Sequence, residues 1–173
     1  MEGNPPVILD CDVLSTFAKT NRIPLIESLF HDSDLLMPDA VFVEIERVRQ
    51  HGYDFPEKIT TSRIKLTYLK DSEAKNLESY IRNASIHYGE AECLCIAKYR
   101  KGVLLTNDFV VRKVCEMEGI MVLDLKDILK EIARRELISK EEMLSLLEDI
   151  EEKDNTLVKE KHEIVNIYEK VDK

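Results

Sequence analysis

Short apolar runs alternate with longer segments of helical periodicity through most of the chain. The apolar runs lie at residues 7–9, 35–37, 103–106 and 120–123. They are too short for helices and are typical of strands that are buried on both faces of a parallel sheet. Residues 63–69 alternate between polar and apolar side chains, which predicts an edge strand or a strand with one polar face. Strands that alternate with helices predict an α/β fold with a largely parallel sheet.

The segments between these runs predict helices. We expect helices at 13–18, 23–30, 72–84, 90–100, 109–118 and from the last strand to about residue 136. Another helix opens at Pro38-Asp39 and continues through Val48. Gly89 is expected to break the chain before the helix at 90–100, and Gly102 to end that helix. Residues 51–61 are mostly polar and contain Gly52 and Pro56, so we predict a loop there.

The pattern changes at residue 139. Ser139 and Glu142 have the spacing of a capping box, and an apolar stripe follows at Met143, Leu146, Leu147 and Ile150. Leu157, Ile164, Ile167 and Val171 suggest a second helix. We therefore divide the chain into an α/β domain at 1–138 and a helical, acidic C-terminal appendage at 139–173, which covers the core or contacts a partner.

Composition narrows the class of protein. No apolar run approaches the ~20 residues of a bilayer span, and the N-terminus lacks the pattern of a secretory signal, so we expect a cytoplasmic protein without a membrane partner. The four cysteines have no CxxC spacing, which favours buried thiols over a zinc site or a disulfide framework. The formal net charge of −9 argues against a protein that coats nucleic acid.

The position of the acids matters more than their number. Asp10 and Asp12 follow the first strand, Asp108 follows a later strand, and Glu90 opens a helix. Glu44 lies between apolar helix positions and is expected to face inward. Ligand sites of parallel sheets lie beyond the carboxyl ends of the strands, so these carboxylates would converge and repel one another. A divalent cation relieves that repulsion, and all-oxygen ligands suit Mg²⁺ or Mn²⁺.

Four motifs in order resemble those of the PIN domain family. They are Ile8-Leu9-Asp10-Cys11-Asp12-Val13-Leu14, the stretch Leu36-Met37-Pro38-Asp39 with the helix that carries Glu44, the stretch Gly89-Glu90-Ala91-Glu92, and Leu104-Leu105-Thr106-Asn107-Asp108. The resemblance covers roughly residues 6–130. It implies a three-layer α/β/α sandwich with a central, mainly parallel sheet, and a metal-dependent endonuclease that mostly cuts RNA.

The resemblance also assigns roles to residues. It implies that Asp10, Glu44, Glu90 and Asp108 are catalytic and hold the metal, that Asp12 is a supporting ligand, and that Thr106 is a hydrogen-bonding helper beside Asp108. Where the family usually has Asp in the third motif, this chain has Glu90 and Glu92. Residues two apart project to different helix faces, and we favour Glu90, with Glu92 in a supporting position.

We therefore expect a Mg²⁺- or Mn²⁺-dependent endoribonuclease that hydrolyses RNA through a metal-activated water, in a toxin-type or RNA-processing role. Expected partners are RNA, an antitoxin or processing-complex protein, and a second copy of the chain in a dimer. One alternative is a haloacid-dehalogenase-like phosphatase, in which Asp10 would be the nucleophile and Asp12 the acid/base. Another is a metal-free PIN module that only binds partners.

Overall fold

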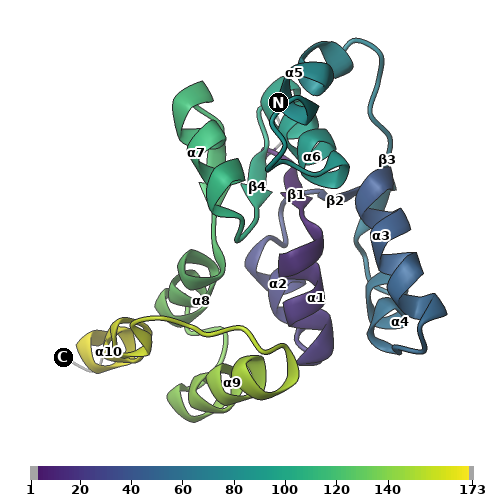
Figure 1. The fold of residues 1–173 in the computed structure, drawn as a ribbon. Coiled ribbons are helices and arrows are strands. Elements are labelled where there is room, and N and C mark those ends of the chain that lie inside the picture. Colours follow the sequence, from purple (N-terminus) through teal and green to yellow (C-terminus); the bar gives the residue numbers. More distant parts are fainter. Residues whose placement is uncertain (1–3, 172–173) are drawn as a thin grey trace.

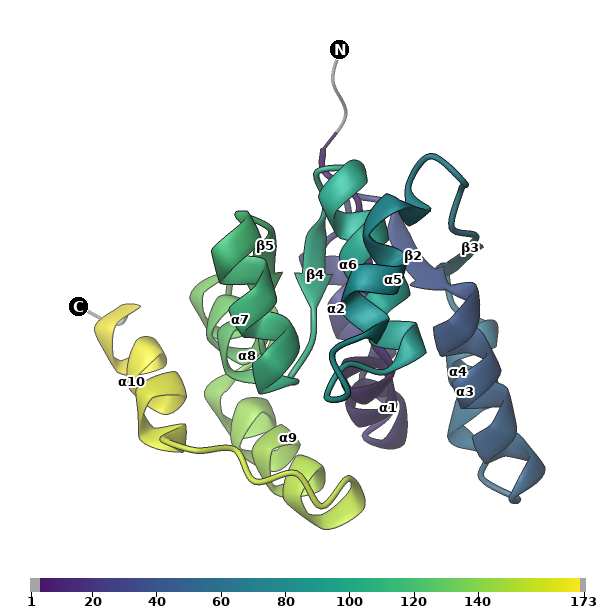
Figure 2. The same cartoon turned by 45° about the horizontal axis from the view of Figure 1, so that its top comes forward.

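The computed structural model describes residues 4–171, with side-chain environments through residue 169. Five parallel strands form one sheet in the order β3-β2-β1-β4-β5 (Figures 1 and 2). The strands are β1 (Val7–Leu9), β2 (Leu35–Pro38), β3 (Lys65–Thr67), β4 (Val103–Leu105) and β5 (Met121–Leu123). Leu9 pairs with Leu105 in register, so β1 and β4 end side by side at the centre of the sheet. The predicted edge strand is β3, which pairs only with β2 among the described strands.

Helices cover both faces of the sheet and complete a three-layer α/β/α sandwich. Those of the first part of the chain are α1 (Cys11–Lys19), α2 (Ile23–Leu29), α3 (Asp39–Gln50), α4 (Phe55–Thr60), α5 (Leu77–Ile81), α6 (Tyr88–Tyr99), α7 (Phe109–Glu118) and α8 (Leu125–Arg134). Helix α6 contacts β1, β2 and β4 and lies beside α7, whereas α2 packs against α8. Helix α1 continues from β1 and contacts α3 and α4 (Figure 1).

Two local predictions of secondary structure were wrong. The predicted loop contains α4, because Phe55 and Ile59 lie one turn apart and are both buried, and Pro56 fits the first turn. The predicted helix at 72–84 is reduced to a 3₁₀ turn (Ala74–Asn76) and α5. Beyond α5, the side chain of Asn83 accepts a hydrogen bond from the amide of Ser85, a local turn that competes with helix.

Gly89 lies inside α6, so the expectation that it breaks the chain was also wrong. The residue is buried, and a Cβ built on it would meet Oε1 of Glu44 at 2.8 Å. The glycine therefore permits the close approach of α3 and α6, which is a packing role and not a helix-ending one.

Two helices follow residue 138, α9 (Lys140–Lys153) and α10 (Lys161–Val171). The capping box of Ser139 and Glu142 is present, and the predicted stripe of α9 is buried. Helix α9 packs on α1, α10 packs on α8, and both contribute residues to the same buried apolar cluster as the sheet. Leu157, predicted as helical, precedes α10 and is 72% exposed, because it belongs to the extended connection between the two helices. The side chain of Val171 lies outside the described part, and the division at residue 138 stays a prediction.

None of the helices in residues 4–171 is long and apolar enough to cross a bilayer.

The packing of α9 generates a stability prediction. Leu146 is fully buried, whereas Leu144 on the same helix is 43% exposed. We expect Leu146→Ala to lower the free energy of unfolding by about 2–5 kcal/mol, because it leaves a cavity in the shared core. Leu144→Ala, the matched control, should change it by less than about 1 kcal/mol. Urea denaturation measures the free energy of unfolding of both variants. Equal losses in the two would contradict the packing of α9 into the same core as the sheet.

Candidate active site

A cavity of about 650 Å³ opens beyond the carboxyl ends of the central strands. Five of the six carboxylates that line it belong to the predicted motifs: Asp10 and Asp12 after β1, Glu44 from α3, Glu90 from α6, and Asp108 before α7. The sequence separates these residues by up to 98 positions, yet the parallel topology brings them to one place. The structure thus gathers the four predicted acids and Asp12 around a single cavity.

Asp10 is the most buried of the five, with 5% of its surface exposed. It caps the N-terminus of α1, where its Oδ1 accepts a hydrogen bond from the amide of Cys11 at 2.7 Å. Its Oδ2 accepts a hydrogen bond from the hydroxyl of Thr106 at 2.8 Å. The Thr106 oxygen in turn accepts from the amide of Asp108 at 3.2 Å. Thr106 therefore links the two predicted acids at the ends of β1 and β4.

Asp12 is held from two sides. Its Oδ1 accepts from the amide of Val13, and its Oδ2 accepts from the amide of Asn107 at 2.8 Å. The side chain of Asn107 accepts from the amide of Leu125 at 2.9 Å. Asn107 therefore ties Asp12 to the start of α8, a role that its place between Thr106 and Asp108 in the sequence did not reveal.

Glu44 and Glu90 meet at the contact of α3 and α6. Gly89 leaves the space that the Glu44 carboxylate occupies, and Glu90 follows it in the first turn of α6. Oε2 of Glu90 accepts a hydrogen bond from the amide of His87 at 2.7 Å, so one oxygen of Glu90 closes the N-terminus of the helix. His87 also lines the cavity.

Glu92 lies outside this cavity. It is 7% exposed, and its Oε2 accepts a hydrogen bond from the amide of Ala40 at 3.0 Å, in the first turn of α3. It lines a separate hollow with Asp39 and Arg47. Of the two glutamates in the third motif, only Glu90 faces the other four acids.

Four carboxylates of the cavity, those of Asp10, Asp12, Glu44 and Glu90, have a raised pKa and hold their protons more tightly than free carboxylates do. Burial is the main cause and raises the pKa of Asp10, Glu44 and Glu90 above the ordinary range. Burial, followed by repulsion from Asp10, raises the pKa of Asp12 to about 7. The His87 side chain opposes the rise in the pKa values of Asp10, Glu44 and Glu90. Bringing these groups together therefore costs free energy at neutral pH.

Carboxylate oxygens dominate the donor set, and they are the ligands that Mg²⁺ and Mn²⁺ prefer. Within the part of the chain that the structure describes, no group of three His, Cys, Asp or Glu side chains is already arranged to hold a metal ion. A cation would have to draw the carboxylates inward, and its charge would offset the burial and repulsion that raise their pKa values. The donors therefore fit a hard divalent cation in kind, without forming a finished site.

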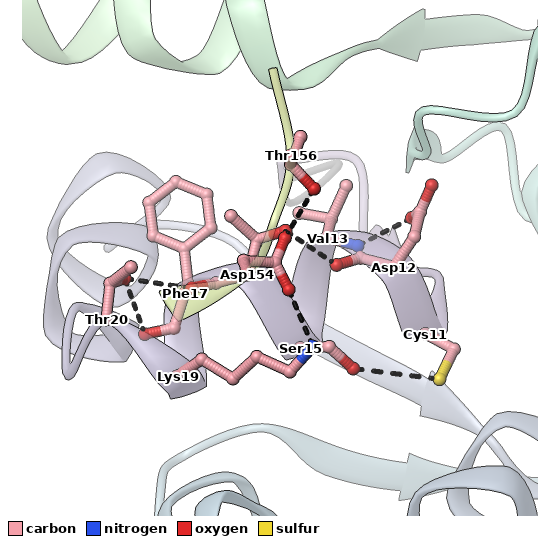
Figure 3. A network of polar contacts seen from close by, with 10 residues as sticks. Cys11, Asp12, Val13, Ser15, Phe17, Lys19, Thr20, Asp154 and Thr156 are labelled. Atoms are coloured by element: carbon pink, nitrogen blue, oxygen red, sulfur yellow. Dashed lines mark hydrogen bonds and ion pairs between the residues drawn. The ribbon is translucent and has the colours of Figure 1, made fainter. Parts of the chain in front are cut away.

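Sequence reasoning missed several residues of the cavity wall, among them Thr16, Lys19, Asp154 and Thr156. Figure 3 shows Asp154 and Thr156 from the C-terminal part beside Lys19 of α1. Thr16 and Lys19 stand four and seven positions after Asp12, which places them on the same helix face, and this spacing was a usable signal. The sequence offered no comparable signal for Asp154 and Thr156.

Comparisons with known proteins matched a family model, a relative and a solved structure. A family model described as a PIN domain (DUF3368) matches residues 6–171. An uncharacterized PIN and TRAM-domain containing protein of Synechocystis is 26% identical over 129 residues, which cover 72% of this chain and 34% of that protein. The chain thus spans about a third of the length of that relative. The solved structure of VapBC-1 from nontypeable Haemophilus influenzae matches with a TM-score of 0.53 and 15% identity, over 68% of this chain and 96% of the other. At that identity the likeness concerns the fold.

The contact between Gly89 and Glu44 predicts a variant in which the Glu44 carboxylate moves while the melting temperature stays nearly unchanged. In Gly89→Ala the new methyl group would displace the Glu44 carboxylate, which is the free end of a flexible side chain. Because alanine also favours helix, we expect the melting temperature to stay within a few degrees of the parent value. A crystal structure of the variant should show the Glu44 carboxylate displaced.

Gly102→Ala is the matched control. Its Cβ would meet the backbone oxygen of Pro6 at 2.7 Å and Cδ1 of Ile8, which cannot move as freely. The melting temperature of this variant should fall clearly. If the Glu44 carboxylate keeps its position in Gly89→Ala, the close approach of α3 and α6 at Gly89 is contradicted.

The raised pKa of Asp10 generates a pH prediction. Below the ordinary aspartate pKa of about 4, both the folded and the unfolded chains are protonated at this position, and its burial costs little. As the pH rises toward the higher folded pKa, the unfolded chain ionises first, so the parent loses stability. Asp10→Asn should therefore be more stable than the parent at pH 8 without added metal, with a gain that vanishes near pH 4. Thermal melts between pH 4 and pH 8 measure the difference in stability between the variant and the parent. A difference that does not change with pH would contradict the raised pKa of Asp10.

Proposed function

The chain belongs to the PIN-domain family, and on that premise we propose that it is a Mg²⁺- or Mn²⁺-dependent endoribonuclease. PIN domains are nucleases, so the general activity is hydrolysis of a phosphodiester bond. The observation that carries the proposal is the convergence of acids from β1, α3, α6 and α7 on one cavity. The dependence on metal and the choice of RNA are the proposed parts.

Asp10, Glu44, Glu90 and Asp108 would hold the metal, with Asp12 as a supporting ligand. When bound, a divalent cation lowers the pKa of water and stabilises negative charge on phosphate oxygens. The chain's own residues prepare for this. Thr106 orients Asp10 through a hydrogen bond from its hydroxyl, and Asn107 orients Asp12 through a hydrogen bond from its backbone N–H. Both contacts use one oxygen of the carboxylate that they orient and keep the side chain in a single rotamer.

The geometry offers less to the phosphatase alternative. Asp10 would have to attack phosphorus as a nucleophile, yet each of its oxygens already accepts a hydrogen bond and the residue is 5% exposed. A carboxylate held in this way is suited to orienting a ligand and poorly suited to moving toward a substrate. The nuclease is therefore the function that the geometry supports better, and an RNA cleavage assay distinguishes it from the phosphatase.

The charge distribution is compatible with an RNA substrate. Residues 139–173 hold 11 acids and 6 bases, and five acids of the remainder (Asp10, Asp12, Glu44, Glu90 and Asp108) line the candidate site. The remaining surface is therefore not strongly acidic, and a bound cation would cancel part of the charge in the cavity. The fold likeness to VapBC-1 supports a toxin-type nuclease with an antitoxin partner. A homodimer and a cytoplasmic location belong to the same proposal.

The decisive experiment is an RNA cleavage assay with Mg²⁺ or Mn²⁺ on several structured and single-stranded RNAs. We expect Asp10→Asn and Glu90→Gln to lower the cleavage rate by about 100-fold or more, because each removes a charged metal ligand. Glu92→Gln is the matched control, since the amide oxygen of the new side chain could still accept from the amide of Ala40 outside the cavity. Its rate should stay within about threefold of the parent.

Two results would contradict the proposal. Cleavage that survives Asp10→Asn or an excess of EDTA would exclude the metal mechanism. Release of phosphate from a small phosphomonoester without any RNA cleavage would favour the haloacid-dehalogenase-like alternative. A loss of activity in Glu92→Gln equal to that in Glu90→Gln would instead overturn the assignment of the third ligand.

A further inference from the structure

Asp154 joins the C-terminal part of the chain to the wall of the acid cavity. Its Oδ1 accepts a hydrogen bond from Nζ of Lys19 at 2.7 Å, and its Oδ2 accepts from the hydroxyls of Thr16 and Thr156 at 2.6 Å each. Figure 3 shows the carboxylate between Thr156 and the side chain of Lys19. All four residues line the cavity that the five acids share.

The two partners of this ion pair are buried to different degrees. The Asp154 side chain is 7% exposed, and a buried carboxylate requires partners of this kind. The Lys19 side chain is 30% exposed. Of the three N–H groups of its ammonium, one donates to Asp154, and no other acceptor is recorded within the described side chains. The ring of Phe55, 5.3 Å from Nζ, adds a cation–π contact that helps to hold the ammonium in place. Both carboxylate oxygens of Asp154 thus accept hydrogen bonds, whereas the ammonium of Lys19 has N–H groups that can donate to a ligand.

The position of Lys19 relative to the acids is set by α1. Asp12, Thr16 and Lys19 follow one another at positions i, i+4 and i+7 and share one face of the helix. Seven residues correspond to about 10 Å of helix rise, so the ammonium lies along the wall and away from the first turn. Among the described residues that line the cavity, Lys19 is the one lysine or arginine.

We propose that the ammonium of Lys19 binds a backbone phosphate of the RNA strand in the cavity, and that Asp154 is the residue that positions it. This inference rests on the proposed function. The five acids of the proposed metal site repel a phosphodiester, whereas the ammonium of Lys19, already oriented by Asp154, offers N–H donors to a phosphate at the cavity wall. A structural role alone would require Lys19 only to neutralise Asp154 and would leave its free donors without a purpose.

The test is binding of a fluorescein-labelled single-stranded RNA oligonucleotide to the full chain, followed by anisotropy over a series of KCl concentrations in EDTA. EDTA keeps cleavage out of the measurement. We expect Lys19→Ala to raise Kd about tenfold, since a charge-assisted contact is lost, and to reduce the salt slope by about one. Lys19→Arg should keep the slope. Lys153→Ala, which removes the exposed pair with Asp149, is the matched control and should leave Kd unchanged.

A second variant separates binding from folding. Lys19→Ala leaves the carboxylate of Asp154 buried without its cation, which lowers stability by itself. The double variant Lys19→Met/Asp154→Asn removes both charges and should restore much of the melting temperature. The weakened binding and the reduced salt slope should persist. Recovery of the parent Kd together with the melting temperature would show that Lys19 is only structural.

The outcomes keep the two proposals distinct. If the parent cleaves RNA and Lys19→Ala binds with the Kd and salt slope of Lys153→Ala, the phosphate contact is wrong and the nuclease stands. If the parent binds RNA through Lys19 but never cleaves it with Mg²⁺ or Mn²⁺, the nuclease is wrong and the contact stands. If the parent binds no RNA at any KCl concentration in EDTA, the phosphate contact is overturned, and the RNA substrate is overturned with it if cleavage with Mg²⁺ or Mn²⁺ is absent as well.

Discussion

The desolvation of Asp10 is the constraint on which the site depends. Its carboxylate is buried between the ends of β1 and β4, where it also caps α1 and accepts the hydroxyl of Thr106. One side chain therefore fixes the start of a helix, links two central strands and supplies the most buried charge of the cavity. A protein selected for stability alone would place a neutral group there, so the cost of burying this carboxylate supports the proposed role of Asp10 as a metal ligand.

Much of this arrangement could be predicted from sequence because parallel sheets follow a simple rule. Apolar runs locate the strands, and polar residues directly after them locate the edge where Asp10 and Asp108 meet. The rule fails for residues on helices, whose direction depends on packing. Gly89 illustrates this, because a glycine before a helical segment is typical of a helix boundary, whereas here it makes room for the carboxylate of Glu44. Only the contact between α3 and α6 reveals that function.

The C-terminal part was the least predictable from sequence. Its apolar stripe correctly predicted that α9 buries one face, but a stripe does not say which surface it meets. The contact with α1 brings Asp154 to the cavity wall, and no local pattern around residue 154 distinguishes that aspartate from its exposed acidic neighbours. Pairing with Lys19 and Thr16 depends on the tertiary path of the chain, which periodicity does not encode.

The hydrogen bond from Thr16 to Asp154 joins residues 138 positions apart, a longer separation than that of any other side-chain hydrogen bond recorded in the described residues. Forming a contact between such distant positions costs loop-closure entropy, and folds rich in such contacts fold slowly. The strands and the acids between residues 10 and 108 are synthesised before this contact is possible. The segment with Asp154 and Thr156 is therefore the last part of the cavity wall to leave the ribosome, and until it docks on α1 the ammonium of Lys19 is without its carboxylate partner.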